Sequence, residues 1–332
     1  MKKSGCLMVA MFVALCASLF VNLLLIAALG ARGSGGVASV RMAPPKVFEE
    51  QVVVEGDSSK KIAVIPLEGI IAYGEAGSLG DSMVDDFKIA LEQAGADSQV
   101  GGVVIQVDSP GGEITASDVV YDAIARLARN KPVVVYMNSI GASGAYYAAC
   151  GAHWIMCNHT TFTGSIGVII STLNYRELFG KIGLQSLTFK SGKFKDMLSG
   201  SREITPEERA YVQGLVMQSY DRFVGIVAKS RKIDEKVLRE GPADGRILSG
   251  TDAYAANLVD ELGYIEDAFD KVREMAEVPD AQVVRYRRSY SLANFFQLFG
   301  ETRSAKIEVD LLKNRVELEP GRVYLLPAFF AP

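Results

Sequence analysis

The sequence predicts an α/β domain built on a mostly parallel sheet, and two observations indicate this class. From Lys61 onward, short apolar runs such as KIAVIPLEG and VGGVVIQVDS alternate with amphipathic stretches such as SMVDDFKIALEQA. The strand-like runs are apolar throughout, which is typical of strands that are covered by helices on both faces. In such sheets ligands bind beyond the carboxyl ends of the strands, where loops lead into helices.

The individual elements follow from these patterns in chain order. We expect strands at 61–69, 100–112, 131–139, 153–157, 165–171 and 283–288, and a strand followed by a loop over 186–200. We expect helices at 82–94, 114–130, 141–150, 205–231, 233–240, 251–257 and 265–277. Thr115 and Asp118 have the spacing of a capping box at the start of a helix. Pro206 directly after Thr205 is typical of the first turn of the long helix.

The N-terminal segment predicts a membrane anchor. No charged residue lies between Lys3 and Arg32, and the apolar run 6–31 exceeds the roughly 20 residues that a spanning helix needs. A cleaved signal peptide has a shorter apolar core of roughly 7–15 residues, so we expect an uncleaved anchor. The short flank before the run favours a cytoplasmic N-terminus and an exported domain.

Composition then divides the chain into four predicted segments. The anchor covers 1–31, and a flexible tether rich in Gly, Ser and Pro covers 32–60. The folded domain is expected at 61–278. A C-terminal extension at 279–332 contains a basic strand-like run and apolar stretches, and no motif defines its role.

Charge and the rare residue types exclude several classes of protein. The net charge of -4 and the scattered Lys and Arg do not form a nucleic-acid footprint, so we expect no nucleic-acid partner. Cys150 and Cys157 lie in apolar stretches and are expected to be buried free thiols. His153 and His159 are the only histidines of the chain. Their surroundings are strand-like, so we expect them to be structural, without a zinc site or a Ser-His-Asp triad.

Ser143 is the first candidate for chemistry. It stands among small residues in GASGAYYAAC, at a predicted turn from strand to helix. The following helix would direct its partly positive N-terminus at the hydroxyl group, which suits a developing oxyanion. The same turn is equally typical of a simple helix N-cap.

Three further segments add groups that acyl transfer requires. The turn ending in Gly111 and Gly112 presents a backbone N–H without a side chain in front of it, although Pro-Gly is also common in plain turns. Ser165 in TGSIG could orient a lysine amine or be incidental to a glycine turn. Lys195 lies in KSGKFKDMLS, where neighbouring apolar side chains could bury it and lower its pKa from about 10.4.

Spacing alone does not select among the lysines of this segment. Lys190 and Lys193 lie close to Lys195 and have the same chemistry. Most lysines are solvated, so a single one is weak evidence for a base.

Together these segments resemble a known family. VVIQVDSPGGEITAS, GASGAYYAAC, TGSIGVI and KSGKFKDML occur in the order found in the bacterial signal peptide peptidase A family, in its short, membrane-anchored form. The resemblance covers roughly residues 61–275. It implies a Clp/crotonase-like fold and a serine protease with a Ser/Lys dyad.

The resemblance also assigns roles to residues. It implies that Ser143 is the nucleophile and that Lys195 is its general base. Ser165 would hydrogen-bond the base, and the backbone amides of Gly112 and Gly144 would form the oxyanion hole. No metal or cofactor is expected.

The resemblance further implies partners and a location. The expected substrates are peptides, namely remnant signal peptides or unfolded segments, and the expected assembly is a homo-oligomer. Membrane lipid would surround the N-terminal helix, with the catalytic domain on the periplasmic side of the bacterial inner membrane.

Three alternatives remain beside this interpretation. The same mechanism could trim other membrane or exported proteins. A crotonase-like acyl-CoA enzyme shares glycine-rich oxyanion turns, but it normally uses carboxylates and acts in the cytoplasm. An inactive scaffold would be expected to lack Ser143 or Lys195, and both are present.

Overall fold

The computed structural model describes residues 15, 18–22, 48–74, 82–288 and 324–325. The chain divides into two units, Met1–Pro45 and Lys46–Pro332, and each is considered by itself. Most of the predicted anchor at 1–31 lies outside the described residues. Within the described part of the chain, no helix has the length and apolarity needed to cross a membrane.

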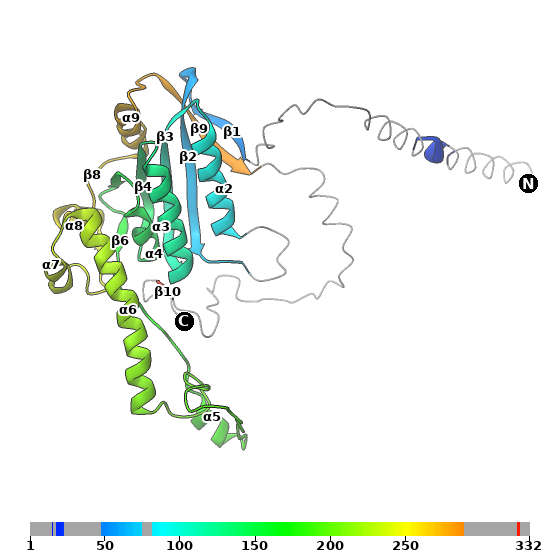
Figure 1. Ribbon diagram of the computed structural model, residues 1–332, viewed down its shortest axis with the longest axis vertical. Helices are drawn as coiled ribbons and strands as arrows, with labels where there is room; N and C mark the ends of the chain where they lie inside the picture. Colours follow the sequence, from blue (N-terminus) through cyan, green and yellow to red (C-terminus); the bar gives the residue numbers. More distant parts are fainter. Residues whose placement is uncertain (1–14, 16–17, 23–47, 75–81, 289–323, 326–332) are drawn as a thin grey trace, which may run out of the picture. The chain divides into compact units, whose positions relative to one another are not determined.

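The second unit is a mixed α/β fold around one sheet (Figure 1). Its strands are β1 (Phe48–Val54), β2 (Asp57–Ile71), β3 (Val100–Glu113), β4 (Val133–Ala142), β5 (Trp154–Cys157), β6 (Phe162–Gly164), β7 (Ile247–Ser249), β8 (Glu261–Leu262), β9 (Ala281–Arg288) and β10 (Tyr324–Leu325). Along the sheet the order is β1-β9-β2-β3-β4-β5-β8. Neighbouring strands in the series β9-β2-β3-β4-β5-β8 are all parallel, whereas β1 pairs antiparallel with β9. The mostly parallel sheet predicted from the apolar runs is therefore confirmed.

Helices cover both faces of this sheet. The described helices of this unit are α2 (Met83–Ala96), α3 (Ile114–Ala128), α4 (Gly144–Ala149), α5 (Arg176–Lys181), α6 (Pro206–Arg231), α7 (Glu235–Glu240), α8 (Gly250–Ala255) and α9 (Ile265–Met275), of which α5 lies away from the sheet. Successive side chains along each strand point to opposite faces of the sheet and therefore belong to two different hydrophobic cores. One core packs α9 against residues such as Val104 and Val134, and the other packs α2, α3 and α4 against residues such as Ile105 and Val135. This double burial explains why the strands are apolar at every position.

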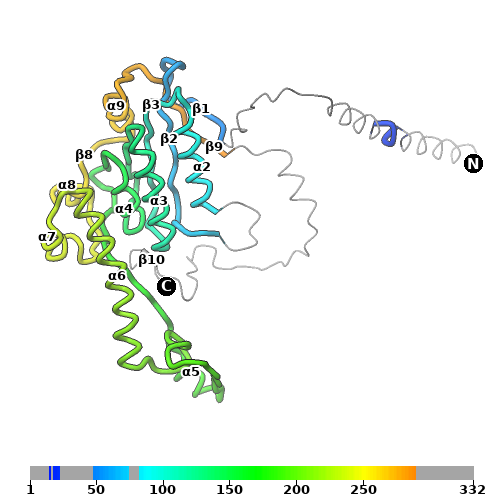
Figure 2. The backbone as a smooth tube through the Cα atoms, in the orientation of Figure 1, coloured from blue at the N-terminus to red at the C-terminus, as the bar shows by residue number. Residues whose placement is uncertain are grey.

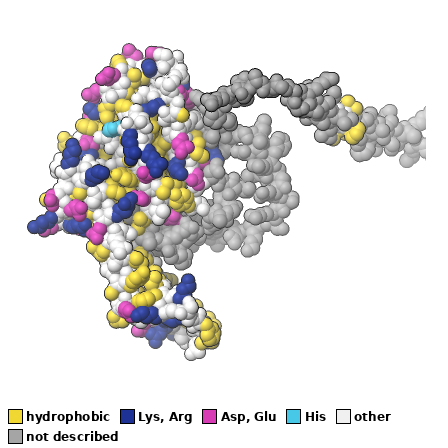
Figure 3. Space-filling view, in the orientation of Figure 1, with side chains coloured by type: hydrophobic (Ala, Val, Ile, Leu, Met, Phe, Trp, Pro, Cys, Tyr) yellow, Lys and Arg dark blue, Asp and Glu magenta, His cyan; other side chains and the backbone are white. Residues whose placement is uncertain are grey.

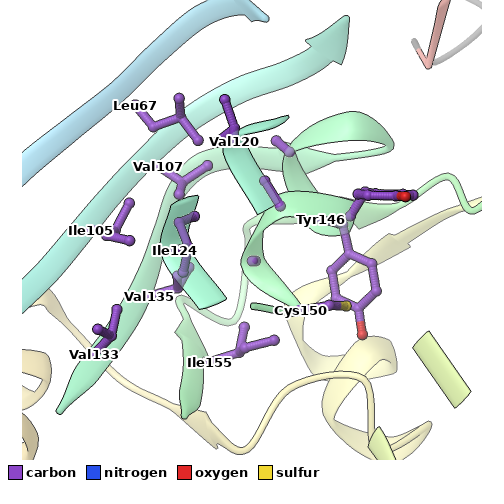
Figure 4. Close-up of a cluster of buried hydrophobic side chains, with 14 of the residues drawn as sticks. Leu67, Ile105, Val107, Val120, Ile124, Val133, Val135, Tyr146, Cys150 and Ile155 are labelled. Carbon is purple, nitrogen blue, oxygen red and sulfur yellow. The ribbon is translucent and has the colours of Figure 1, made fainter. Parts of the chain in front are cut away.

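The larger core surrounds the short helix α4. Tyr146 and Cys150 lie beside Ile155, and the strand residues Val133 and Val135 continue the cluster toward α3 (Figure 4). The smooth course of the chain through these layers is shown in Figure 2. The cluster holds α4 rigidly against the carboxyl ends of β3 and β4.

Three of the described strands, β1, β9 and β10, lie outside the segment predicted as the folded domain. β1 begins at Phe48, within the predicted tether, and pairs along its length with β9, which lies in the predicted C-terminal extension. The sequence FEEQVVV mixes four apolar with three polar residues, and most of its side chains are exposed because β1 is an edge strand. β9 lies between β1 and β2, so its apolar positions are buried.

Three local predictions are wrong. Residues 186–200, expected as a strand followed by a loop, contain no strand. The first helix turn after β3 has Glu113 as its N-cap without a side-chain bond, so Thr115 and Asp118 form no capping box. The Asp118 carboxylate instead accepts hydrogen bonds from Tyr147 and Arg222. The run 165–171 is not a strand, because the extended segment that pairs with β4 is residues 162–164. The long helix begins at Pro206 after Thr205, as predicted, and the structure shows in addition a capping box formed by Thr205 and Glu208.

Cys150 and Cys157 are free and buried, as predicted. Burial raises the pKa of each thiol to about 12. We therefore expect both thiols to resist alkylation by iodoacetamide at pH 8, by roughly a thousandfold relative to the unfolded chain, since the thiolate is the reactive form. Mass spectrometry of native and urea-unfolded protein would measure this, and rapid labelling of either cysteine in the native protein would contradict it.

Candidate active site

Ser143 lies at the carboxyl end of β4, in the turn that leads into α4. Its backbone has φ 54° and ψ -116°, a combination that residues other than glycine rarely adopt. Two backbone bonds of 2.8 Å hold the turn, from Ser143 N–H to Gly164 O and from Tyr147 N–H to Ser143 O. The Ser143 side chain is buried, and its Oγ has no hydrogen-bond partner among the described residues. Such strained strand-to-helix turns hold the nucleophile in many hydrolases.

Ser165 lies beside Ser143 because of strand pairing. β6 runs parallel to β4, with Ala142 opposite Gly164. Ser143 directly follows Ala142, and Ser165 directly follows Gly164, so the two serines lie at neighbouring strand ends. Ser165 also has a positive φ, of 49°, and its N–H donates to Arg246 O at 2.8 Å. The structure thus brings together these two predicted site residues.

Gly112 and Gly144 meet at the same turn. A Cβ on Gly144 would lie 3.1 Å from the Gly112 nitrogen, so the two backbones are in contact. A Cβ on Gly112 would lie 2.0 Å from Ile71 O, a steric clash that every residue except glycine would make. Because α4 has only six residues, its helix dipole is small. The two backbone amides would therefore contribute more than the dipole to stabilising a negative charge at this turn. Each amide directed at an oxyanion is worth about 3–4 kcal/mol.

Two tyrosines anchor α4 behind this turn. Tyr146 donates to Leu258 O at 2.7 Å, and Tyr147 donates to Asp118 at 2.6 Å. Burial, followed by the hydrogen bond to Asp118, raises the pKa of Tyr147 well above its ordinary value. Both hydroxyl groups therefore stay protonated and keep the helix in place at neutral pH.

The structure does not bring Lys195 to Ser143 within one chain. Lys195 is exposed, so the burial expected from its apolar neighbours is wrong for the single chain. It lies in the arm, which we define as residues 171–205, between β6 and α6. The part of the arm around α5 extends away from the sheet and from α4 (Figure 1). Few side chains of the arm are buried, because the arm contributes to neither hydrophobic core of the domain.

An ionic network organises the loop that carries Lys195. Arg202 donates to both oxygens of Asp196, at 2.6 and 2.8 Å, and to both oxygens of Glu208, at 2.5 and 2.9 Å. Lys190 also donates to Asp196, at 2.6 Å. These bonds lower the pKa of Asp196 below its usual range, and the bond from Arg202 lowers that of Glu208 to about 2. Arg202 thereby joins the lysine loop to the first turn of α6.

The edge of β3 at this site accepts an extended chain. Residues 324–325, as strand β10, pair antiparallel with Gly112 and Glu113. An extended peptide can therefore hydrogen-bond beside the predicted oxyanion hole, by strand addition. Across the described residues, no cluster of three or more side chains is suited to hold a metal ion.

Comparison with known proteins identifies the family. The model described as "Peptidase family S49" matches residues 125–279, a range that contains Ser143, Ser165 and Lys195. A protein of Enterococcus faecium named "Putative signal peptide peptidase SppA" is 39% identical over 72% of this chain and 70% of its own length. The chain belongs to peptidase family S49.

Longer members of the family match over part of their length. The chloroplastic serine protease SPPA of Arabidopsis thaliana is 31% identical over 66% of this chain and 33% of its own length. Protease 4 of Salmonella typhi is 32% identical over 70% of this chain and 37% of its own length. The family and these relatives support a serine protease activity for this S49 chain.

Arg202→Met tests the role of the ionic network. We expect it to leave the domain core folded, to make the arm more susceptible to cleavage by added trypsin, and to lower peptidase activity severalfold. The partly exposed carboxylate of Asp196 and the buried carboxylate of Glu208 would lose their shared partner. Arg176→Met is the matched control, since its ion pair with Glu203 is largely exposed. Equal effects of the two changes would contradict the role of Arg202.

Proposed function

We propose that this chain is a membrane-bound serine endopeptidase that cleaves remnant signal peptides, with Ser143 as nucleophile and Lys195 as general base. The observation that carries the proposal is the geometry of Ser143. Its hydroxyl group is buried and unpartnered within the described residues, on a strained turn beside the amides of Gly112 and Gly144. The printed name of the relative from Enterococcus faecium supports signal peptides as the substrate class.

The reaction follows from these groups. The Lys195 amine takes the proton of the Ser143 hydroxyl as Oγ attacks a peptide carbonyl carbon. The amides of Gly112 and Gly144 stabilise the oxyanion. The intermediate collapses to an acyl-enzyme as the leaving amine takes the proton from Lys195. Water, deprotonated by the same lysine, then attacks the ester, and the carboxylic acid product leaves as Ser143 regains its proton.

Ser165 fits the role of orienting the lysine. It lies on the strand end next to Ser143 and is almost fully buried. A lysine that enters this site would meet both hydroxyl groups at once. It would also leave water for apolar surroundings, which favours its neutral, basic form.

The lysine that serves Ser143 comes from a neighbouring copy of the chain in this proposal. Lys195 is exposed in its own chain, on an arm that extends away from the site. The arm also exposes apolar side chains, with Leu187 80% and Phe189 97% exposed. Apolar side chains of the arm are visible at its tip in Figure 3. Exposed apolar surface of this kind favours a contact with another molecule.

The anchor, the location and the fold family complete the proposal. The apolar run 6–31 would hold the enzyme in the bacterial inner membrane, with the S49 domain on the periplasmic side, near released signal peptides. The mostly parallel sheet with oxyanion amides at its strand ends is compatible with a Clp/crotonase-like fold. Trimming of other exported or membrane proteins would use the same machinery.

Single substitutions test the dyad. Ser143→Ala and Lys195→Ala should each lower kcat for a signal-peptide substrate by roughly four orders of magnitude, because nucleophile and base act as a unit. Lys193→Ala is the matched control, since Lys193 lies on the same loop and pairs with Glu207. Substantial activity in either dyad variant would refute the assignment.

Mixing the two inactive variants tests the origin of the base. Full-length Ser143→Ala and Lys195→Ala proteins, co-expressed and purified in detergent, should regain a fraction of wild-type activity, because mixed assemblies contain sites with both groups intact. Each variant expressed alone provides the control. A mixture that stays inactive, although the two chains co-purify, would place both groups of the dyad in one chain.

A further inference from the structure

Ser117 is a buried hydroxyl group that the mechanism above does not use. It lies in the first turn of α3 and is fully buried. Its Oγ has no hydrogen-bond partner among the residues that the structure describes. A serine in a helix usually donates to the carbonyl four residues earlier, here that of Glu113. Ser117 does not, so its hydroxyl group is directed elsewhere at a cost in stability.

The side chain of Ser117 lies against the oxyanion turn. A Cβ built on Gly144 would lie 2.3 Å from Ser117 Oγ and 3.1 Å from the Gly112 nitrogen. The hydroxyl group and the Gly112 amide therefore flank the same face of Gly144. The arrangement follows from the chain course, since α3 begins directly after Gly112 and Glu113, and α4 begins at Gly144.

Two unpartnered hydroxyl groups thus border one turn. Ser143 Oγ and Ser117 Oγ are both buried, and both lack a partner within the described residues. Buried polar groups are almost always hydrogen-bonded, so an unpaired group in a native fold needs an explanation. A bound substrate supplies one, because its carbonyl oxygen becomes an anion that accepts up to three hydrogen bonds.

We propose that Ser117 is a third donor to the oxyanion, together with the amides of Gly112 and Gly144. The hydroxyl group donates its hydrogen to the carbonyl oxygen of the substrate as Ser143 attacks, and it keeps that proton throughout. The stabilisation grows as negative charge develops, so it acts mainly on the transition state. This inference rests on the proposed function of Ser143.

Ser117→Ala tests the inference, because it removes only the hydroxyl oxygen. We expect kcat to fall 10- to 1,000-fold with KM changed by less than about threefold. The melting temperature should stay the same or rise, since an unpaired buried hydroxyl is lost. Binding of a peptide boronate, which forms a tetrahedral adduct with the nucleophile, should weaken by a similar factor to the loss in kcat/KM.

Thr115→Ala is the matched control, since it deletes an exposed hydroxyl group from the same turn of α3. It should leave kcat, KM and melting temperature unchanged. Ser117→Cys is a second variant that fills the site with a weak donor, and it should lose kcat while the protein stays folded. These measurements use the full-length protein in detergent.

Two outcomes would overturn the inference. Unchanged kcat in Ser117→Ala would show that the hydroxyl group has no role in the reaction. A fall in kcat together with a lowered melting temperature in both Ser117 variants would show a packing role only. Failure of the proposed function is distinct, because it would be seen as activity retained in Ser143→Ala.

Discussion

The close backbone approach at the carboxyl ends of β3 and β4 is the constraint on which the rest of the site depends. Gly112 lies against the Ile71 carbonyl at a distance that excludes any side chain, and Gly144 lies in tight contact with the Gly112 amide. The same contact brings the Ser117 hydroxyl group and the Gly112 amide beside Gly144, the residue that follows Ser143. The strained φ of Ser143 is part of the same arrangement, and the core around Tyr146 maintains it.

The arm is organised by a different kind of interaction. Residues 171–199 bury no side chain, so hydrophobic packing within the chain cannot fix their conformation. Arg202 holds the loop instead, through paired hydrogen bonds to Asp196 and Glu208, and Phe194 stacks on Tyr211 with ring centroids 5.4 Å apart. A segment that is ordered by charges and exposes apolar side chains is suited to completing a site on a second molecule.

Much of the fold was predictable because its signals are local. The apolar strands β2 to β5 and the long helix α6, with its cap at Thr205, follow from residue patterns within single segments. The edge strand β1 was missed because it is short and lies in a segment whose Gly, Ser and Pro content is typical of a tether. The run 165–171 was misjudged because an apolar segment that forms only an isolated bridge, at Ile169, resembles a strand in sequence.

The sequence by itself determined the family motifs, the candidate residues Ser143, Ser165, Gly112, Gly144 and Lys195, and the alternation of strands and helices. These depend on residue type and on spacing over a few positions. Only the tertiary structure decided which candidates meet, because strand pairing joins Ser143 to Ser165 and glycine contacts join Gly144 to Gly112 across distant parts of the chain. It also showed Lys195 exposed on an arm and Ser117 buried against the oxyanion turn, since burial depends on packing between elements, which spacing along one chain does not encode.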